Sequence, residues 1–439
     1  MTSTVQHRNA KSILSFCPTS VALALAAAFA ALLLTTPSAQ AQTYSVLYTF
    51  TNGADGANPT GGLVRDPAGN LYGTTNGGFA GSWEILFKLN STGHFTVLHT
   101  FGAAGDGRYP NGDLIRDAGG NLYGTTVYGG NGPCYNYSGC GTVFKVDGKT
   151  GKEKVLLRFR DSRKSGWQPT AGLFKDESGN LYGSTPRGGT HEVGLVFKLD
   201  QAGIETVVHN FTDRADQGIS SAGVIRAGSH LYGTTASGGD LSACADSGCG
   251  TVFKVDEGTD KWTVLHAFSG GAGGAGPGGH LARDEAGNLY GATLAGGDLN
   301  CDDSGYGCGT VYRVDETTGK ETVLYSFRGG ADGKLPFGGL VRDASGYLYG
   351  TTYYGGDFNC KGSPDGCGTI FKIDERTGEE TVPYTFHGGT DGGASFGGLT
   401  LDGQGSLYGT TSGGGGEGCT GAGCGVVFKL ALNEDGNST

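Results

Sequence analysis

The sequence lacks several patterns that would assign it to a common functional class. Only 31 of its 439 residues are Lys or Arg, against 42 Asp or Glu, which gives a formal net charge of −11. A surface this acidic argues against nucleic acid as a partner. The chain has no Gly-x-Ser-x-Gly, no His-Glu-x-x-His and no phosphate-binding glycine loop before a helix. These absences favour a binding protein over an enzyme, although an active site can also assemble from single residues far apart in the chain.

Long apolar runs are also missing, except for one near the start. Val21–Leu34 is uninterrupted, and Arg8 and Lys11 precede it. With the Ser-Ala-Gln-Ala that follows, this pattern predicts a secretory signal peptide over residues 1–41. The run is shorter than the ~18 residues of a membrane span, so an uncleaved anchor is the weaker alternative. Cleavage removes two positive charges and changes the net charge from −11 to −13. We therefore expect a secreted, extracellular protein without a membrane span.

Glycine, by contrast, is abundant, with 87 copies. The glycines have no three-residue period, which excludes collagen, and a hydrophobic content of 37% argues against disorder. A segment Leu-Tyr-Gly-(Thr/Ser/Ala)-Thr recurs seven times, at intervals of 50 to 59 residues. Its tyrosines are Tyr72, Tyr123, Tyr182, Tyr232, Tyr290, Tyr349 and Tyr408. The chain is therefore a tandem repeat.

Each repeat predicts four short strands. In the sixth repeat these are residues 338–343, 348–352, 369–374 and 380–386, rich in β-branched and aromatic types and bounded by Gly or Asp. The first two strands are joined by Asp-x-x-Gly-Asn or a variant of it, which is a hairpin turn. Each repeat is thus a four-stranded antiparallel meander, and a ring of such units is a β-propeller.

The number of strands predicts how the ring closes. The fourth type of strand occurs before the first repeat, at residues 44–50, and the last repeat has only three strands. We therefore expect an all-β, seven-bladed β-propeller over residues 42–431, with its last blade closed by the N-terminal strand, and a polar tail over residues 432–439. An open solenoid is the alternative, but no polar capping repeat is visible. We expect a monomer.

Ten cysteines follow the predicted signal peptide in five close pairs, each between the second and third strands of a blade. The pairs are Cys134 and Cys140, Cys244 and Cys249, Cys301 and Cys308, Cys360 and Cys367, and Cys419 and Cys424. In an exported chain this spacing predicts five disulfides within loops, because two thiols per loop leave a zinc site half empty. These loops and the connections between blades emerge on one face, which we call the long-loop face. A ligand is expected there.

The repeat resembles that of the GloVer-type secreted tandem-repeat proteins. The resemblance rests on Gly-Gly-Leu-Val-Arg-Asp, Asn-Leu-Tyr-Gly-Thr-Thr, Gly-Thr-Val-Phe-Lys-Val-Asp and Thr-Val-Leu-His-x-Phe, and it covers residues 44–431. It implies an exported protein with a choice of anchor types, and it leaves the activity open. The repeat is also similar to NHL-type propeller repeats, which places Gly-Gly-Leu-Val-Arg-Asp innermost.

The third blade departs from the repeat and carries the candidate ligand-binding residues. Basic, aromatic and acidic side chains stand there where other blades have mostly glycine: Arg160, Arg163, Trp167, Arg187, His191 and Glu192. Such a notch suits an acidic sugar or a carboxylate, which Arg binds by forked hydrogen bonds and Trp by stacking. A drifted loop without a ligand is an equally good interpretation.

Other functions remain open. We expect a binding module for carbohydrate or protein. A propeller hydrolase or lyase of an extracellular polysaccharide, using His191, Glu192 and Arg187, is one alternative, and a structural surface protein is another. No cofactor is expected, although Ca²⁺ is possible. Its weak candidate ligands are Asp298, Asp302 and Asp303, for which Asx turns are the simpler account.

Overall fold

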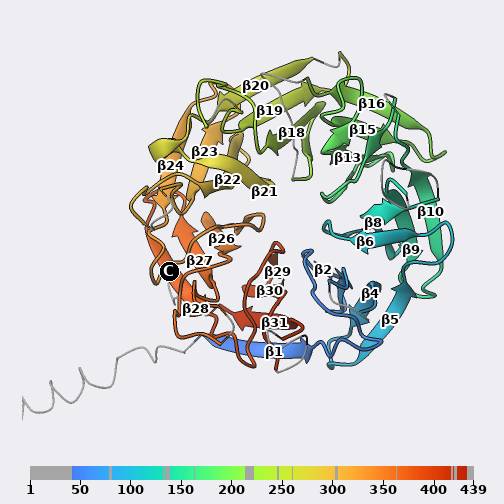
Figure 1. The fold of residues 1–439 in the computed structure, drawn as a ribbon, viewed down its shortest axis with the longest axis horizontal. Helices are drawn as coiled ribbons and strands as arrows, with labels where there is room; N and C mark the ends of the chain where they lie inside the picture. Colours follow the sequence, from blue (N-terminus) through green and yellow to red (C-terminus); the bar gives the residue numbers. More distant parts are fainter. Residues whose placement is uncertain are drawn as a thin grey trace, which may run out of the picture. The chain divides into compact units, whose positions relative to one another are not determined.

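A computed structural model describes the chain from residue 42 to residue 432, with gaps. The described residues are 42–78, 82–131, 134, 139–162, 164–212, 222–244, 247–259, 261–301, 305–361, 363–416, 419 and 423–432. Within them, seven antiparallel blades surround a central axis (Figure 1). No helix in these ranges has the length and hydropathy to cross a membrane. The predicted seven-bladed propeller is confirmed, whereas the expected signal peptide and residues 433–439 of the expected tail lie outside the described residues.

In blades one to six the four strands run in chain order from the axis outward (Figure 1), and in the last blade the outermost strand is β1 (Thr43–Thr49). In blades one to three they are β2 (Val64–Arg65), β3 (Leu71–Thr75), β4 (Ile85–Leu89) and β5 (Phe95–Thr100); β7 (Ile115–Arg116), β8 (Asn121–Gly129), β9 (Thr142–Asp147) and β10 (Glu153–Arg158); and β12 (Phe174–Lys175), β13 (Leu181–Thr185), β15 (Leu195–Leu199) and β16 (Glu205–Asn210). In blades four and five they are β17 (Ile225–Ala227), β18 (His230–Thr235), β19 (Thr251–Asp256) and β20 (Trp262–Ala267); and β21 (Ala275–Arg283), β22 (Asn288–Ala295), β23 (Thr310–Asp315) and β24 (Glu321–Ser326).

The last two blades complete the ring. They are β25 (Val341–Arg342), β26 (Tyr347–Thr351), β27 (Thr369–Asp374) and β28 (Glu380–Thr385); and β29 (Thr400–Leu401), β30 (Ser406–Thr411), β31 (Val426–Ala431) and β1 (Thr43–Thr49). Short additional pieces are β6 (Gly107–Pro110), β11 (Gly166–Trp167), β14 (Arg187–Gly188) and the 3-10 turn η1 (Gly271–Gly273). Most innermost strands are only two residues long. The glycines that precede them are not part of the hydrogen-bonded strand pair.

The contacts in blade one show what the residues of the repeated motif do. Asp66 accepts the backbone N–H of Asn70 at 2.9 Å and the hydroxyl of Tyr72 at 3.0 Å, so the turn and the second strand are fixed together. A Cβ on Gly73 would lie 2.7 Å from Cζ of Phe87, and only glycine leaves room for that ring. The Asp, Tyr, Gly and Phe of this repeat therefore form one packing unit, which recurs except where blade four has Ala227 for the Asp and blade five has Tyr312 for the Phe.

The ring closes as predicted, through β1. This strand pairs antiparallel with β31, so that the last sheet has the order β1-β31-β30-β29. Tyr44 stacks on Tyr384 of blade six at 3.8 Å between ring centroids, and Tyr48 stacks on Phe95 of blade one at 4.1 Å. The closing strand thus contacts the blades on both sides of its own.

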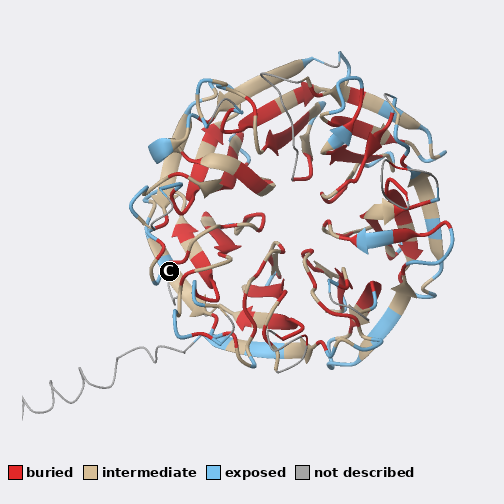
Figure 2. Cartoon of the chain, in the orientation of Figure 1, coloured by how far each residue is buried: buried red, intermediate tan, exposed pale blue. Residues whose placement is uncertain are grey.

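The core lies inside and between the blades. Figure 2 shows buried residues concentrated in the middle strands, whereas the outermost strands are mainly intermediate or exposed. The phenylalanine of the third strand packs edge-on against a phenylalanine of the preceding blade, as Phe371 does against Phe327 at 5.1 Å. Hydrophobic contact between neighbouring blades therefore stabilises the ring.

All five predicted disulfides are formed, and each lies between the second and third strands of its blade. The pairs are Cys134–Cys140, Cys244–Cys249, Cys301–Cys308, Cys360–Cys367 and Cys419–Cys424. Each closes a small ring, so the stabilisation per bridge is modest, on the order of 2 kcal/mol. Their main effect is to fix the shape of the loops on the long-loop face.

Candidate functional site

A cavity of about 640 Å³ lies on the axis at the long-loop face. Its walls come from two kinds of segment: residues at or just after the ends of second strands, such as Asn76 and Ala236, and residues leading into innermost strands, such as Asn58 and Phe337. All seven blades contribute to the lining. The volume falls within the range of roughly 300 to 1,000 Å³ that is usual for small-ligand sites.

One wall of the cavity is polar. The side chain of Asn58 donates through Nδ2 to Oδ1 of Asn76 at 2.7 Å, and Nδ2 of Asn76 donates to Oγ1 of Thr60 at 3.3 Å. The hydroxyl of Thr60 donates to Oδ1 of Asn111 at 3.0 Å. These side chains form one hydrogen-bonded row across blades one and two. A row of amides holds both donors and acceptors in fixed directions.

The other wall is aromatic and belongs to blades six and seven. Phe337 and Phe396 line the cavity, with ring centroids 5.2 Å apart. Tyr353 supports both rings from behind, at 5.9 Å from Phe337 and 4.4 Å from Phe396. All three side chains are half-buried. The cavity therefore presents amides in blades one and two and aromatic faces in the adjoining blades seven and six.

Two charged residues form the floor. The residue before the innermost Leu or Val is glycine in five blades but Asp113 in blade two and His280 in blade five. The five glycines are Gly62, Gly172, Gly223, Gly339 and Gly398. Nε2 of His280 lies 2.9 Å from Oδ2 of Asp113, so the pair spans the axis. It also lines a smaller cavity of about 260 Å³, bounded by the innermost strands.

The glycines make room for this pair. A Cβ on Gly223 would clash with Cε1 of His280, and the backbone N–H of Gly62 donates to Oδ1 of Asp113. Burial opposes charge on both groups, but their mutual hydrogen bond and opposite charges outweigh it. The pKa of Asp113 is therefore lowered and that of His280 is raised. Both groups are charged at mildly acidic pH.

The pair predicts a pH dependence of stability. The raised pKa of His280 means that its contribution is present in full below about pH 6.5 and is lost as pH rises through its folded value. The lowered pKa of Asp113 means that its contribution is present above about pH 4 and is lost as pH falls further. We expect the stability difference between wild type and Asp113→Asn to be largest near pH 5.5 and smaller at pH 9, as measured by urea unfolding. An equal difference at both pH values would contradict this account.

The residues predicted at blade three are only partly brought together. Trp167 is 6% exposed, and its backbone pairs with that of Arg187. The guanidinium of Arg187 lies 5.3 Å from the centre of the indole ring, so one face of Trp167 is covered within the protein. Pro186 lines the central cavity, so this loop reaches the cavity rim.

The remaining candidates are mostly exposed. Arg160, His191 and Glu192 lie on the surface, and Nδ1 of His191 is 3.0 Å from the hydroxyl of its neighbour Thr190. Arg163 lies outside the described residues. Of the calcium candidates, Asp298 accepts the backbone N–H of Asn300 at 2.9 Å, as in an Asx turn. Asp302 and Asp303 lie outside the described residues.

Sequence reasoning missed the pair at the floor and the aromatic wall. Asp113 and His280 were detectable as the two interruptions of an otherwise regular glycine position. Phe337 and Phe396 occupy the place just before the paired glycines, where blade two has Asn111. Both signals are single-residue departures inside segments that otherwise repeat from blade to blade.

The fold and its cysteine-bearing loops define a repeat β-propeller, and the comparisons agree. The profile of the Gloeobacter/Verrucomicrobia repeat matches residues 35–245, 136–363 and 241–439, so the chain belongs to this repeat family. No curated protein matches the sequence.

Several solved structures share the fold. A GH74 xyloglucanase from Xanthomonas campestris has 13% identity and a TM-score of 0.52, over 84% of this chain and 52% of that enzyme. An oligogalacturonate lyase in complex with manganese has 14% identity and a TM-score of 0.51, over 90% of this chain and 97% of its own. An oligogalacturonate lyase from Vibrio parahaemolyticus has 11% identity and a TM-score of 0.50, over 90% and 98%. At these identities the likeness concerns the fold alone.

Proposed function

We propose that the protein is an extracellular carbohydrate-binding module whose ligand occupies the central cavity on the long-loop face. The observation that carries the proposal is the meeting of a row of amides with a pair of aromatic rings on adjoining parts of the cavity wall. A sugar presents hydroxyls at its edge and C–H groups on its faces. The amide row from Asn58 to Asn111 suits the hydroxyls, and the rings of Phe337 and Phe396 suit the C–H faces.

The surroundings of the cavity support the same function. Three aromatic side chains in the second-to-third loops are unusually exposed: Trp83 by 49%, Tyr306 by 77% and Phe358 by 50%. Exposed rings on the face that holds the cavity extend the surface available to a longer sugar chain. Five disulfides are typical of an oxidising compartment, which supports export and a cleaved leader. A protein ligand is less well suited, because a cavity of about 640 Å³ has room for only a small part of a protein surface.

Glycan binding by variants tests the proposal. We expect the mature protein to bind at least one oligosaccharide in a glycan screen, and Phe396→Ala to weaken that binding about ten-fold through loss of the stacking face. Phe358→Ala is the matched control, because it removes a ring that does not line the cavity and should weaken only longer ligands. A loss confined to Arg160→Ala with Arg187→Ala would instead place the ligand at the blade-three notch. Absence of any bound glycan would refute the proposal.

A second function, hydrolysis or lysis of a polysaccharide, is favoured by the Asp113–His280 pair. An imidazole held by a carboxylate at 2.9 Å, on the floor of a cavity, is the usual arrangement of a general base and the group that orients it. If the protein is such an enzyme, His280→Gln will abolish turnover of a glycan while leaving its binding measurable. If the wild type binds a glycan but does not cleave it, the enzyme function is ruled out and only the binding function remains.

A further inference from the structure

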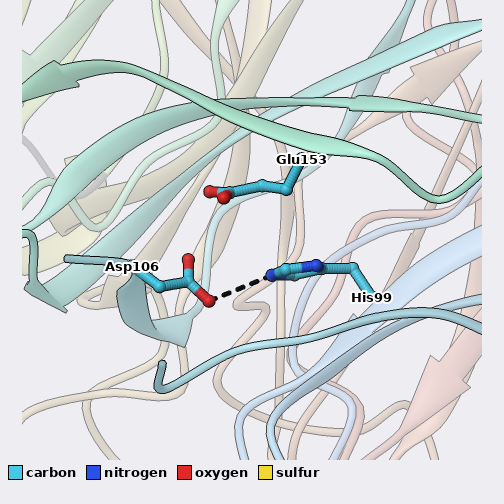
Figure 3. Close-up of side chains that lie close together, drawn as sticks. All are labelled: His99, Asp106 and Glu153. Atoms are coloured by element: carbon cyan, nitrogen blue, oxygen red, sulfur yellow. Dashed lines mark hydrogen bonds and ion pairs between the residues drawn. The ribbon is translucent and has the colours of Figure 1, made fainter. Parts of the chain in front are cut away.

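A cluster of three potential metal ligands lies between blades one and two and includes none of the predicted binding residues. His99 comes from β5, Asp106 from the connection between the blades, and Glu153 from the start of β10. Figure 3 shows their side chains pointing toward one another. Nε2 of His99 is 3.0 Å from Oδ2 of Asp106, and the ligand atoms of all three residues lie within 4.8 Å of one another.

Oε1 of Glu153 is buried and, within the described part of the chain, has no hydrogen-bond partner. The same holds for Oε1 of Glu321 and of Glu380 at the equivalent positions of other blades. What distinguishes this cluster is that a histidine and an aspartate both lie beside the glutamate. The guanidinium of Arg158 donates to the carbonyl oxygen of Gly105 at 3.0 Å, and its positive charge also attracts the carboxylate of Glu153.

The same place in another pair of blades shows what is special here. Between blades five and six the corresponding residues are Tyr325, Asp332 and Glu380, and the hydroxyl of Tyr325 donates to Oδ2 of Asp332 at 2.9 Å. There the guanidinium of Arg328 lies 3.4 Å from Asp332 and supplies a positive charge. Between blades one and two, His replaces Tyr and Gly102 stands in the place of that arginine.

A third pair of blades lacks one ligand. Between blades four and five, Nε2 of His266 lies 3.4 Å from Oε2 of Glu321, but Gly273 stands in the place of the aspartate. A Cβ on Gly273 would lie 3.4 Å from Oε2 of Glu321, so an aspartate there would point at the pair. Within the described residues, His, Asp and Glu come together only between blades one and two.

We propose that His99, Asp106 and Glu153 bind a divalent transition-metal ion, with Zn²⁺ as the best fit. One imidazole and two carboxylates provide three ligands, and water completes a tetrahedral site. An imidazole ligand favours Zn²⁺ over Ca²⁺ or Mg²⁺, which prefer oxygen alone. Ligand atoms on tetrahedral zinc are about 3.3 Å apart, so a modest rotation of the Glu153 side chain completes the site. The ion would join the outermost strands of two blades.

Metal binding by matched variants tests this proposal. The metal-free mature protein should bind one equivalent of Zn²⁺ in a calorimetric titration, more tightly than Ca²⁺, and should give a Co²⁺ absorption spectrum of a low-coordinate site. His99→Tyr recreates the arrangement that blade five already uses, so it should fold and bind Zn²⁺ at least ten-fold more weakly. Gly273→Asp should add a second equivalent beside His266 and Glu321.

The results of these titrations either support or contradict the metal site. Equal Zn²⁺ binding by wild type and His99→Tyr, or tighter binding of Ca²⁺ than of Zn²⁺, would overturn the proposal. Circular dichroism and the Tm in the presence of chelator show whether the variant has folded. Zn²⁺ should raise the Tm of the wild type and not that of His99→Tyr, because only the former gains a link between blades. None of these results bears on the proposed glycan binding, which is tested separately.

Discussion

A chain that begins at Thr51 is expected to fail to form a closed propeller. It lacks β1 and Phe50, which is 2% exposed. Removing a buried Phe costs about 3–5 kcal/mol by itself. The deletion also removes the ring of Tyr44, which lies between blades six and seven, and exposes the edge of β31. The combined loss approaches the total stability of about 5–15 kcal/mol of an ordinary domain. Thermal unfolding should show no cooperative transition near that of the full chain.

Two controls make the result specific. Ser45→Ala changes an exposed residue of β1 and should leave the Tm unchanged. A synthetic peptide of residues 42–50, added to the truncated chain, should restore a cooperative transition, because it supplies the strand pairing, side-chain packing and tyrosine hydrogen bonds of β1. A truncated chain that melts like wild type would show that three strands suffice for the last blade.

Removing one partner of the Asp113–His280 pair should destabilise the protein by about 1–3 kcal/mol at pH 5.5, since it leaves a partly buried charged group unpaired. Both Asp113→Gly and His280→Gly replace the residue with the glycine found in the other five blades. The double variant completes the ring of glycines and leaves no charge at the floor. It should therefore lose less stability than the sum of the two single variants.

A double-mutant cycle measures this coupling. Urea unfolding of the wild type, both single variants and the double variant gives the interaction energy directly, and the entropic cost of each added glycine cancels in the cycle. The coupling should fall as pH rises through the raised pKa of His280, because the imidazole then loses its charge. Additive losses at pH 5.5 would show that the two side chains do not interact and that the cavity has no fixed floor.

Much of the fold could be predicted because every blade repeats the same physical constraints. Gly73 must be glycine because the ring of Phe87 packs against it, and Asp66 must accept from Asn70 and Tyr72. Such constraints recur at fixed places, so counting them gave seven blades, the closing strand and the five disulfide loops. The regular spacing of these residues is why the sequence predicts the architecture.

The cavity was harder to predict because it depends on distances across the axis. The sequence shows that Asp113 and His280 interrupt a glycine position, but only the width of the ring decides whether they meet. Trp167 illustrates the reverse case. Its departure from the repeat suggested a ligand contact, and the structure places its ring in a buried position beside Arg187. A departure from a repeat indicates a changed local environment, and the neighbours determine whether that change faces solvent.

The pairing of β1 with β31 also determines which part of the propeller can fold last during synthesis. Thr43 pairs with Ala431, so the contacts that close the ring join the first strand to the last. Contacts within the other blades are local, whereas this one spans almost the whole propeller and so has a high contact order. Blades one to six can form as the chain emerges, with the edge of β1 still unpaired. We expect the slow step of folding to be the final docking of the last blade, once the strand that pairs with β1 has been made.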